Sequence, residues 1–167
     1  QIMDAIFQKI HNEGYKFIAI SIIVTFILLL ISKFLGFIGL LITIWVYYFF
    51  RDPDRVSIDD QNYLVSPADG LITQIVETNG PKEFSLENKK FTRVSIFMSV
   101  FNCHVNRSPA LALIEDMFYV PGKFLNATLD KASEDNERNL IKFKTNNGDE
   151  VVVVQIAGLI ARRIICE

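Results

Sequence analysis

The chain has 167 residues, of which 50% are hydrophobic, and a formal net charge of −2 at pH 7. This length allows one domain with an accessory segment, and the absence of a basic stripe with interleaved aromatics gives no support for a nucleic-acid partner. The two cysteines, Cys103 and Cys166, lack the spacing of metal ligands. We interpret them as reduced, buried thiols of a cytosolic domain and predict no metal site.

Two short apolar helices, at about residues 15–31 and 34–50, are the first elements predicted along the chain. Each is nearly free of charge, and Ser32-Lys33 separates them. One continuous helix over this stretch would measure roughly 54 Å, whereas the hydrocarbon core of a bilayer is about 30 Å thick. We therefore predict a transmembrane helical hairpin within residues 1–50. A buried helical hairpin of a soluble protein is the alternative.

The orientation of this hairpin follows from its cations. Lys9 and Lys16 precede it and Arg51 and Arg55 follow it, whereas Lys33 lies alone in the turn. The positive-inside rule then places both ends in the cytoplasm. The aromatic residues near the end of the second helix, Trp45, Tyr47 and Tyr48, suit a membrane interface.

Residues 51–167 are predicted to form a β-rich domain. Short β-type segments alternate with turn signals such as Asn146-Asn147-Gly148-Asp149. Six such segments predict a mainly β fold, a sandwich or a barrel-like structure. The predicted strands cover residues 71–77, 91–101, 111–120, 140–144, 150–157 and 159–166. Because the last of them runs almost to Glu167, we expect the domain to be incomplete at its C-terminal end.

His104 is the strongest catalytic candidate. It is one of only two histidines and follows an apolar, strand-like segment. Asp69, in the turn Ser66-Pro67-Ala68-Asp69-Gly70, offers a carboxylate that would orient an imidazole for proton transfer. A structural histidine and a structural turn are the alternative interpretation of both residues. A nucleophile is missing, because no serine lies on a nucleophile-elbow sequence.

Several polar residues are candidates for binding an anionic substrate. Asn106 and Arg107 crowd around His104, and Arg162 and Arg163 interrupt an apolar segment in which one of them is expected to face inward. An internal carboxylate is an equally good partner for such an arginine. Lys123 follows Gly122, but the remainder of a phosphate-loop motif is absent.

Three blocks of sequence resemble the phosphatidylserine decarboxylase proenzyme family, in its short bacterial form. They are Phe50-Arg51-Asp52-Pro53-Asp54-Arg55, Val65-Ser66-Pro67-Ala68-Asp69-Gly70 and Phe101-Asn102-Cys103-His104-Val105-Asn106-Arg107-Ser108-Pro109. The segments 121–127, 136–139 and 155–164 extend the resemblance, so that it covers nearly the whole chain.

The resemblance implies a carboxy-lyase of phospholipid biosynthesis, which converts phosphatidylserine to phosphatidylethanolamine and CO2. It implies a covalent pyruvoyl group, made when the proenzyme cuts itself before a serine and supplying the electron sink for decarboxylation. It assigns Asp69 and His104 to the self-cleavage relay. The implied partners are phosphatidylserine, the lipid bilayer, the α chain cut from the same proenzyme, and a second copy in a homodimer. The implied location is the bacterial inner membrane, with the catalytic domain on its cytoplasmic side.

The sequence departs from the family pattern because it contains no Gly-Ser step. We therefore expect it to be the β-chain region, with the pyruvoyl-forming serine downstream of Glu167, and to be inactive alone. The main alternative is a non-catalytic, membrane-anchored β domain that binds lipid headgroups or a partner protein. A serine hydrolase that uses an internal serine is a third possibility.

Overall fold

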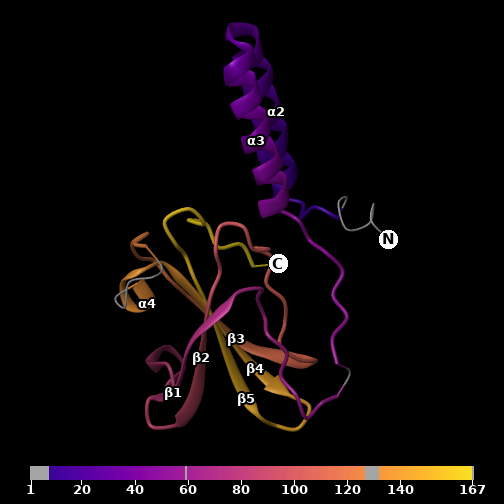
Figure 1. Cartoon of the computed structure of the whole chain (residues 1–167). Helices are drawn as coiled ribbons and strands as arrows, with labels where there is room; N and C mark the ends of the chain where they lie inside the picture. The colour runs from indigo at the N-terminus through magenta and orange to yellow at the C-terminus, as the bar shows by residue number, and fades with distance from the viewer. Residues whose placement is uncertain (1–7, 59, 127–131, 167) are drawn as a thin grey trace. The chain divides into compact units, whose positions relative to one another are not determined.

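The computed structural model describes residues 8–58, 60–126 and 132–166 (Figure 1). The chain forms two compact units. Unit 1 comprises the described parts of Gln1–Ser57 together with Ala68–Gly70 and Met98–Arg107. Unit 2 comprises the described parts of Ile58–Pro67, Leu71–Phe97 and Ser108–Glu167.

The two predicted apolar helices are present in unit 1. They are α2, Gly14–Ile31, and α3, Lys33–Phe49. Ser32 between them is extended, with φ −158° and ψ 138°, and its hydroxyl accepts a hydrogen bond from the Phe34 N–H. A serine in this position caps the start of a helix and lets the chain reverse direction.

Small side chains allow α2 and α3 to pack closely side by side (Figure 1). A Cβ atom on Gly36 would lie 2.9 Å from the Leu29 Cα, and one on Gly39 would lie 3.0 Å from the Thr25 Cα. The Thr25 and Thr43 hydroxyls are hydrogen-bonded at 2.9 Å. Small residues and interhelical hydroxyl bonds are typical of helix pairs in membranes. By length and composition α2 is able to cross a membrane, which is weak evidence for a span, and α3 is shorter.

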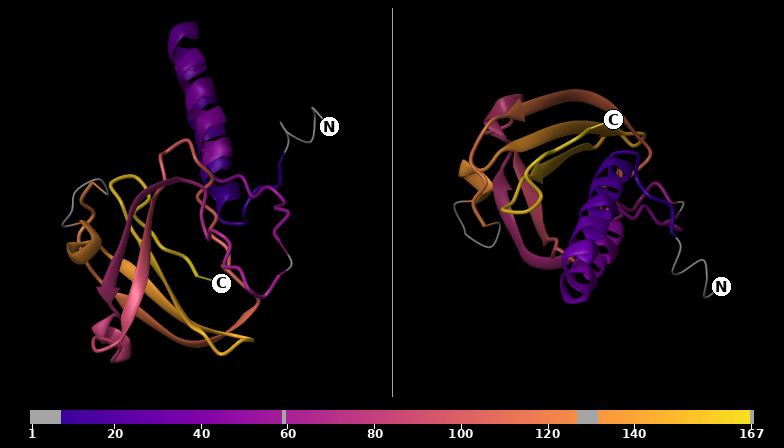
Figure 2. Two further views of the ribbon diagram at one scale, coloured as in Figure 1. Left: turned by 60° about the horizontal axis from the view of Figure 1, so that its bottom comes forward. Right: turned by 90° about the horizontal axis from the view of Figure 1, so that it is seen from above.

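Unit 2 is built from two antiparallel sheets, which confirms the mainly β prediction. One sheet pairs β1, Leu71–Asn79, with β2, Lys90–Phe97, and the short 3-10 helix η1, Lys82–Phe84, lies in their connection. The other has the order β3-β4-β5. Its strands span Ala112–Val120, Arg138–Thr145 and Glu150–Ile156, and α4, Ala132–Asp135, precedes β4. Figure 2 shows both sheets from two further sides. The two sheets share no strand, so a closed barrel is not confirmed.

The turn between β4 and β5 is the one that the sequence predicts. Gly148 has φ +88°, in the region that glycine adopts without strain, and its N–H donates to the Thr145 carbonyl at 2.9 Å. The turn fixes the register in which Lys144 pairs with Glu150 and Leu140 pairs with Val154. Leu140, Ile141 and Phe143 of β4 are buried, so β4 supplies much of the core of unit 2.

Buried polar groups connect the segments around β4. The side chain of Asn136 is fully buried and bonds to both backbone groups of Leu125 and to the carbonyl of Ala157. Arg138 of β4 pairs with Glu83 of η1 at 3.0 Å, and both side chains are largely buried. Burial alone would raise the pKa of Glu83, but a backbone hydrogen bond and the Arg138 guanidinium hold it below its ordinary value.

Four expectations about the chain are wrong. Residues 159–166 form no strand, because local bonds such as Arg162 N–H to the Ile160 carbonyl take the place of a ladder. Arg162 and Arg163 are therefore both exposed, rather than one facing inward. The second predicted strand ends at Phe97 instead of residue 101. Cys103 is a buried free thiol as predicted, but Cys166 is exposed.

Candidate functional site

The loop Met98–Arg107 follows β2 and carries His104 within unit 1. A turn opens this loop, in which the Asn102 N–H donates to the Ser99 carbonyl at 2.9 Å. The loop is bound to the end of α3 in the same unit. The Trp45 indole N–H donates to the Val100 carbonyl at 3.1 Å, and the Arg51 guanidinium donates to the Phe101 carbonyl at 3.2 and 3.3 Å.

The imidazole of His104 is half-buried and is held by two contacts. Its Nδ1 lies 3.0 Å from the Asn102 carbonyl oxygen. One face of the ring stacks on Phe49, with centroids 4.0 Å apart and planes 19° from parallel. Because a carbonyl only accepts hydrogen bonds, Nδ1 carries the proton, and the lone pair of the neutral ring lies on Nε2.

The environment of His104 favours the neutral imidazole. Burial lowers the pKa of His104, and the nearby positive charge of Arg51 lowers it further, whereas the hydrogen bond to Asn102 acts in the opposite direction. The net pKa lies below the ordinary value. A neutral imidazole with an unprotonated Nε2 is able to accept a proton at neutral pH, as a general base must.

Asp69 lies in the same compact unit as His104 but bonds elsewhere. Its carboxylate forms an ion pair with Arg55, and both side chains are more than 40% exposed. In the structure it is therefore the Asn102 carbonyl, not a carboxylate, that orients the imidazole.

The candidate substrate-binding residues fall into two groups. Asn106 and Arg107 lie in unit 1, where Asn106 contacts the Met98 sulfur at 3.7 Å and Arg107 pairs with Asp52 and donates to the Pro53 carbonyl at 2.7 Å.

Lys123, Arg162 and Arg163 lie in unit 2. Lys123 pairs with Asp135 at 3.2 Å, and Arg162 donates to the Leu159 carbonyl and lies over the Phe124 ring. Arg163 is exposed.

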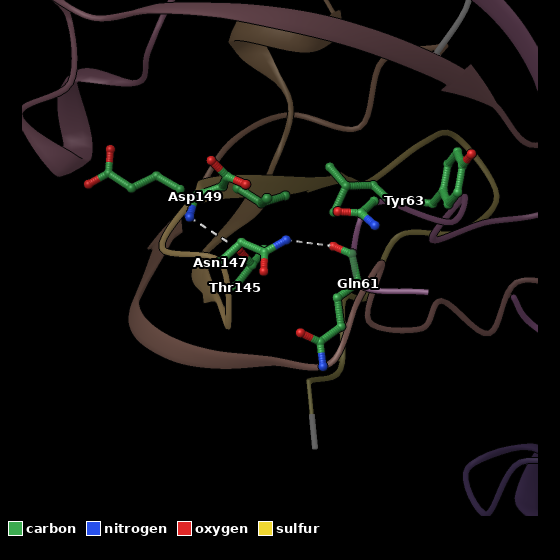
Figure 3. A pocket seen from close by; sticks show the side chains of 9 residues that line it. Gln61, Tyr63, Thr145, Asn147 and Asp149 are labelled. Carbon is green, nitrogen blue, oxygen red and sulfur yellow. Dashed lines mark hydrogen bonds between the residues drawn. The ribbon is translucent and has the colours of Figure 1, made fainter. Parts of the chain in front are cut away.

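Unit 2 also contains a pocket, of about 320 Å³, that no sequence motif predicts (Figure 3). It lies between residues 61–64 and the β4–β5 turn, where the Asn147 side-chain amide donates to the Gln61 carbonyl at 3.0 Å. None of the candidate catalytic or substrate-binding residues lines it.

Sequence reasoning missed three groups that act on His104 or Asp69: Phe49 stacks on the imidazole, Arg51 lowers its pKa, and Arg55 pairs with the carboxylate. Phe49 belongs to an uninterrupted apolar run, which gives no sign that it contacts a histidine. Arg51 and Arg55 both belong to the distinctive block Phe50-Arg51-Asp52-Pro53-Asp54-Arg55, which is the feature of the sequence that indicates a role near the site.

Comparisons with known proteins agree with the resemblance seen in the sequence. The family model described as phosphatidylserine decarboxylase matches residues 42–167. A protein of Pelagibacter ubique (strain HTCC1062) is 63% identical over 166 residues, which are 99% of this chain and 77% of the relative. A protein of Ruegeria pomeroyi is 49% identical over 166 residues (99% and 76%), and one of Rickettsia typhi is 50% identical over 162 residues (97% and 70%). All three are named phosphatidylserine decarboxylase proenzyme.

Proposed function

Because the chain belongs to the phosphatidylserine decarboxylase family, we propose that it is part of a carboxy-lyase that converts phosphatidylserine to phosphatidylethanolamine and CO2. The observation that carries this proposal is 63% identity over 99% of the chain to a proenzyme of that name. The neutral, half-buried imidazole of His104 supports it, because family membership requires a base and this histidine is able to act as one.

We propose a pyruvoyl group as the cofactor, formed from a serine outside these 167 residues, which contain no Gly-Ser step. When present, this group supplies the electron sink for loss of CO2. The donor set around His104 fits its formation, since Nε2 is the nitrogen left to accept the proton of a serine hydroxyl.

Asp69 is proposed as the second member of the self-cleavage relay. To orient His104, Asp69 must break its ion pair with Arg55. The Nδ1–H of His104 must also exchange its hydrogen bond to the Asn102 carbonyl for one to the Asp69 carboxylate. Breaking the exposed Asp69–Arg55 pair costs little free energy, because exposed ion pairs contribute only about 0–1 kcal/mol to stability.

Asn106 and Arg107 are proposed to bind the phosphate or carboxylate of the substrate headgroup. They share a unit with His104, and Arg107 is the nearest arginine to it along the sequence. Lys123, Arg162 and Arg163 are also proposed to bind an anionic group of the substrate. A guanidinium suits this role because it binds carboxylate or phosphate through two parallel hydrogen bonds.

We propose that α2 and α3 span the membrane, within an N-terminal region of residues 1–50, and that residues 51–167 form the decarboxylase domain. The apolar helices and their small-residue interface support a membrane location. The cations on both sides of the hairpin support the cytoplasmic side of a bacterial inner membrane.

The α chain of the same proenzyme is the proposed protein partner. Unit 2 exposes many large apolar side chains on its sheets and its last segment, and an exposed apolar surface of this kind is typical of an interaction site. They include Leu71, Ile72, Ile75, Leu113, Ile114, Met117, Phe118, Tyr119, Leu159 and Ile160. Separately from the α chain, we propose a second copy of the protein as a partner in a homodimer.

The test uses the complete gene product in vesicles that contain phosphatidylserine with a labelled carboxyl group. We expect the wild type to separate into two chains and to release labelled CO2. His104→Ala removes the base, and loss of a general base slows a reaction by about 10²–10⁴-fold, so that this variant remains uncut and releases no CO2.

His11→Ala is the matched control, because it removes the other histidine of these 167 residues, and we expect it to behave as the wild type. An uncut wild type that binds vesicles without releasing CO2 would instead support a non-catalytic domain.

A further inference from the structure

Phe49 is the last residue of α3, and its ring lies directly against the imidazole of His104. The centroid distance of 4.0 Å and the interplanar angle of 19° describe a stacked pair. Stacking restricts rotation of the imidazole out of its plane, and the ring covers one face against water. No other aromatic ring among the described residues stacks on this histidine.

The backbone around this pair is fixed on both sides. On the loop side, the Asn102 carbonyl holds Nδ1 of His104. On the helix side, the buried Cys103 thiol donates to the Arg51 carbonyl at 3.1 Å, which ties the residue before His104 to the chain just after α3. The contact between Phe49 and His104 is therefore supported by bonds on either side of it.

We propose that Phe49 is a positioning residue for His104, which holds the imidazole plane so that Nε2 faces the group it deprotonates. This inference rests on the proposed function, in which His104 is the base. It also assigns the end of the second apolar helix a direct part in forming the site.

The lowered pKa of His104 agrees with this role. Burial is the main cause of its lowered pKa, and the Phe49 ring is part of what buries it. Arg51 is the charged group that acts on the imidazole. A smaller or non-planar side chain at position 49 would admit water, so the pKa of His104 would rise toward its ordinary value.

The experiment measures the rate of self-cleavage of the newly synthesised, complete proenzyme in vesicles as a function of pH. Phe49→Leu keeps an apolar side chain but removes the ring, and we expect cleavage to slow about three- to tenfold, the equivalent of one stacked aromatic pair. We also expect the pH at half-maximal rate to move upward. Phe49→Tyr retains the ring and should stay close to the wild type in both rate and pH midpoint.

Phe37→Leu is the matched control, because it makes the same substitution at an exposed position of α3. Equal rates and equal pH midpoints for the wild type and Phe49→Leu would overturn the proposal. Equal slowing of Phe49→Leu and Phe49→Tyr would also overturn it, because the ring would then not be the feature that matters. If Phe49→Leu does not accumulate in vesicles, Phe49→Met and Phe49→Trp provide the same comparison.

His104→Ala separates this inference from the function on which it rests. If His104→Ala is cleaved, the proposed function fails. If His104→Ala is uncut and Phe49→Leu is cleaved normally, only the role of Phe49 is rejected.

Discussion

At the scale of single residues, the properties of His104 follow from its contacts, some of which involve residues distant in the sequence. His104 is recognisable as a catalytic candidate because histidines are rare in this chain and this one follows an apolar segment. Its tautomer depends on the Asn102 carbonyl, and its burial depends on groups that include Phe49, 55 residues earlier. Residue type and spacing do not reveal such contacts.

The protonation of His104 provides a direct test of this environment. Burial lowers its pKa, so the midpoint of its titration in an NMR experiment should lie below the ordinary value of about 6.5. Long-range ¹H–¹⁵N spectra of the proenzyme in detergent should show the neutral ring protonated on Nδ1. The signal is identified by its loss in His104→Gln.

The sign of the effect on stability follows from the same shift. Because the pKa of His104 is lowered in the folded state, the imidazole binds its second proton more readily in the unfolded chain than in the folded chain. The contribution of neutral His104 to stability is therefore complete above about pH 6.5 and is lost as the pH falls through the lower pKa of the folded state. A midpoint above the ordinary value, or a neutral ring protonated on Nε2, would contradict the described geometry.

At the scale of elements, the sequence predicts those whose pattern and boundaries are both clear. The uncharged runs predict α2 and α3, and the Asn-Gly turn predicts the β4–β5 hairpin. Residues 159–166 show the limit of this reasoning. Apolar content alone does not specify a strand: Leu159 and Ile160 are exposed, and the segment bonds to itself.

The Glu83–Arg138 pair links η1 to β4 and allows a test of how unit 2 is stabilised. Glu83→Gln leaves a largely buried guanidinium without its carboxylate, which should destabilise unit 2 by roughly 1–3 kcal/mol. The measurement is the shift of the urea midpoint followed by tertiary-structure signals. In the wild type this contribution should be complete above about pH 4.3 and lost as the pH falls through the lowered pKa of Glu83.

Asp135→Asn is the control for this substitution, because it removes a carboxylate from the exposed Lys123–Asp135 pair. A change below about 0.5 kcal/mol is expected there. Equal shifts for the two variants would show that the burial of the Glu83–Arg138 pair has no special effect.

At the scale of the whole molecule, the proposed topology connects the apolar helices with a lipid substrate. A membrane anchor keeps a decarboxylase within reach of phospholipid headgroups. Composition is enough to predict the helices, but it does not predict that residues 98–107 belong to the same compact unit as α2 and α3. That association depends on long-range hydrogen bonds such as Trp45 to Val100.

The orientation of the hairpin is testable by labelling single cysteines in intact cells. In a background with Cys103→Ser and Cys166→Ser, Lys33→Cys in the turn should react with a membrane-impermeant maleimide. Ser57→Cys should react only after lysis, because both ends of the hairpin are predicted to be cytoplasmic. Labelling of Ser57→Cys alone in intact cells would reverse the proposed topology.

The most direct measurement of the central claim is the intact mass of the complete gene product, purified as the wild type and as the His104→Ala variant. We predict that the wild type yields two chains, one of them beginning with a pyruvoyl group, and that His104→Ala yields a single unmodified chain. A wild type that remains a single chain and still decarboxylates phosphatidylserine, or a His104→Ala variant that cleaves at the normal rate, would contradict the account.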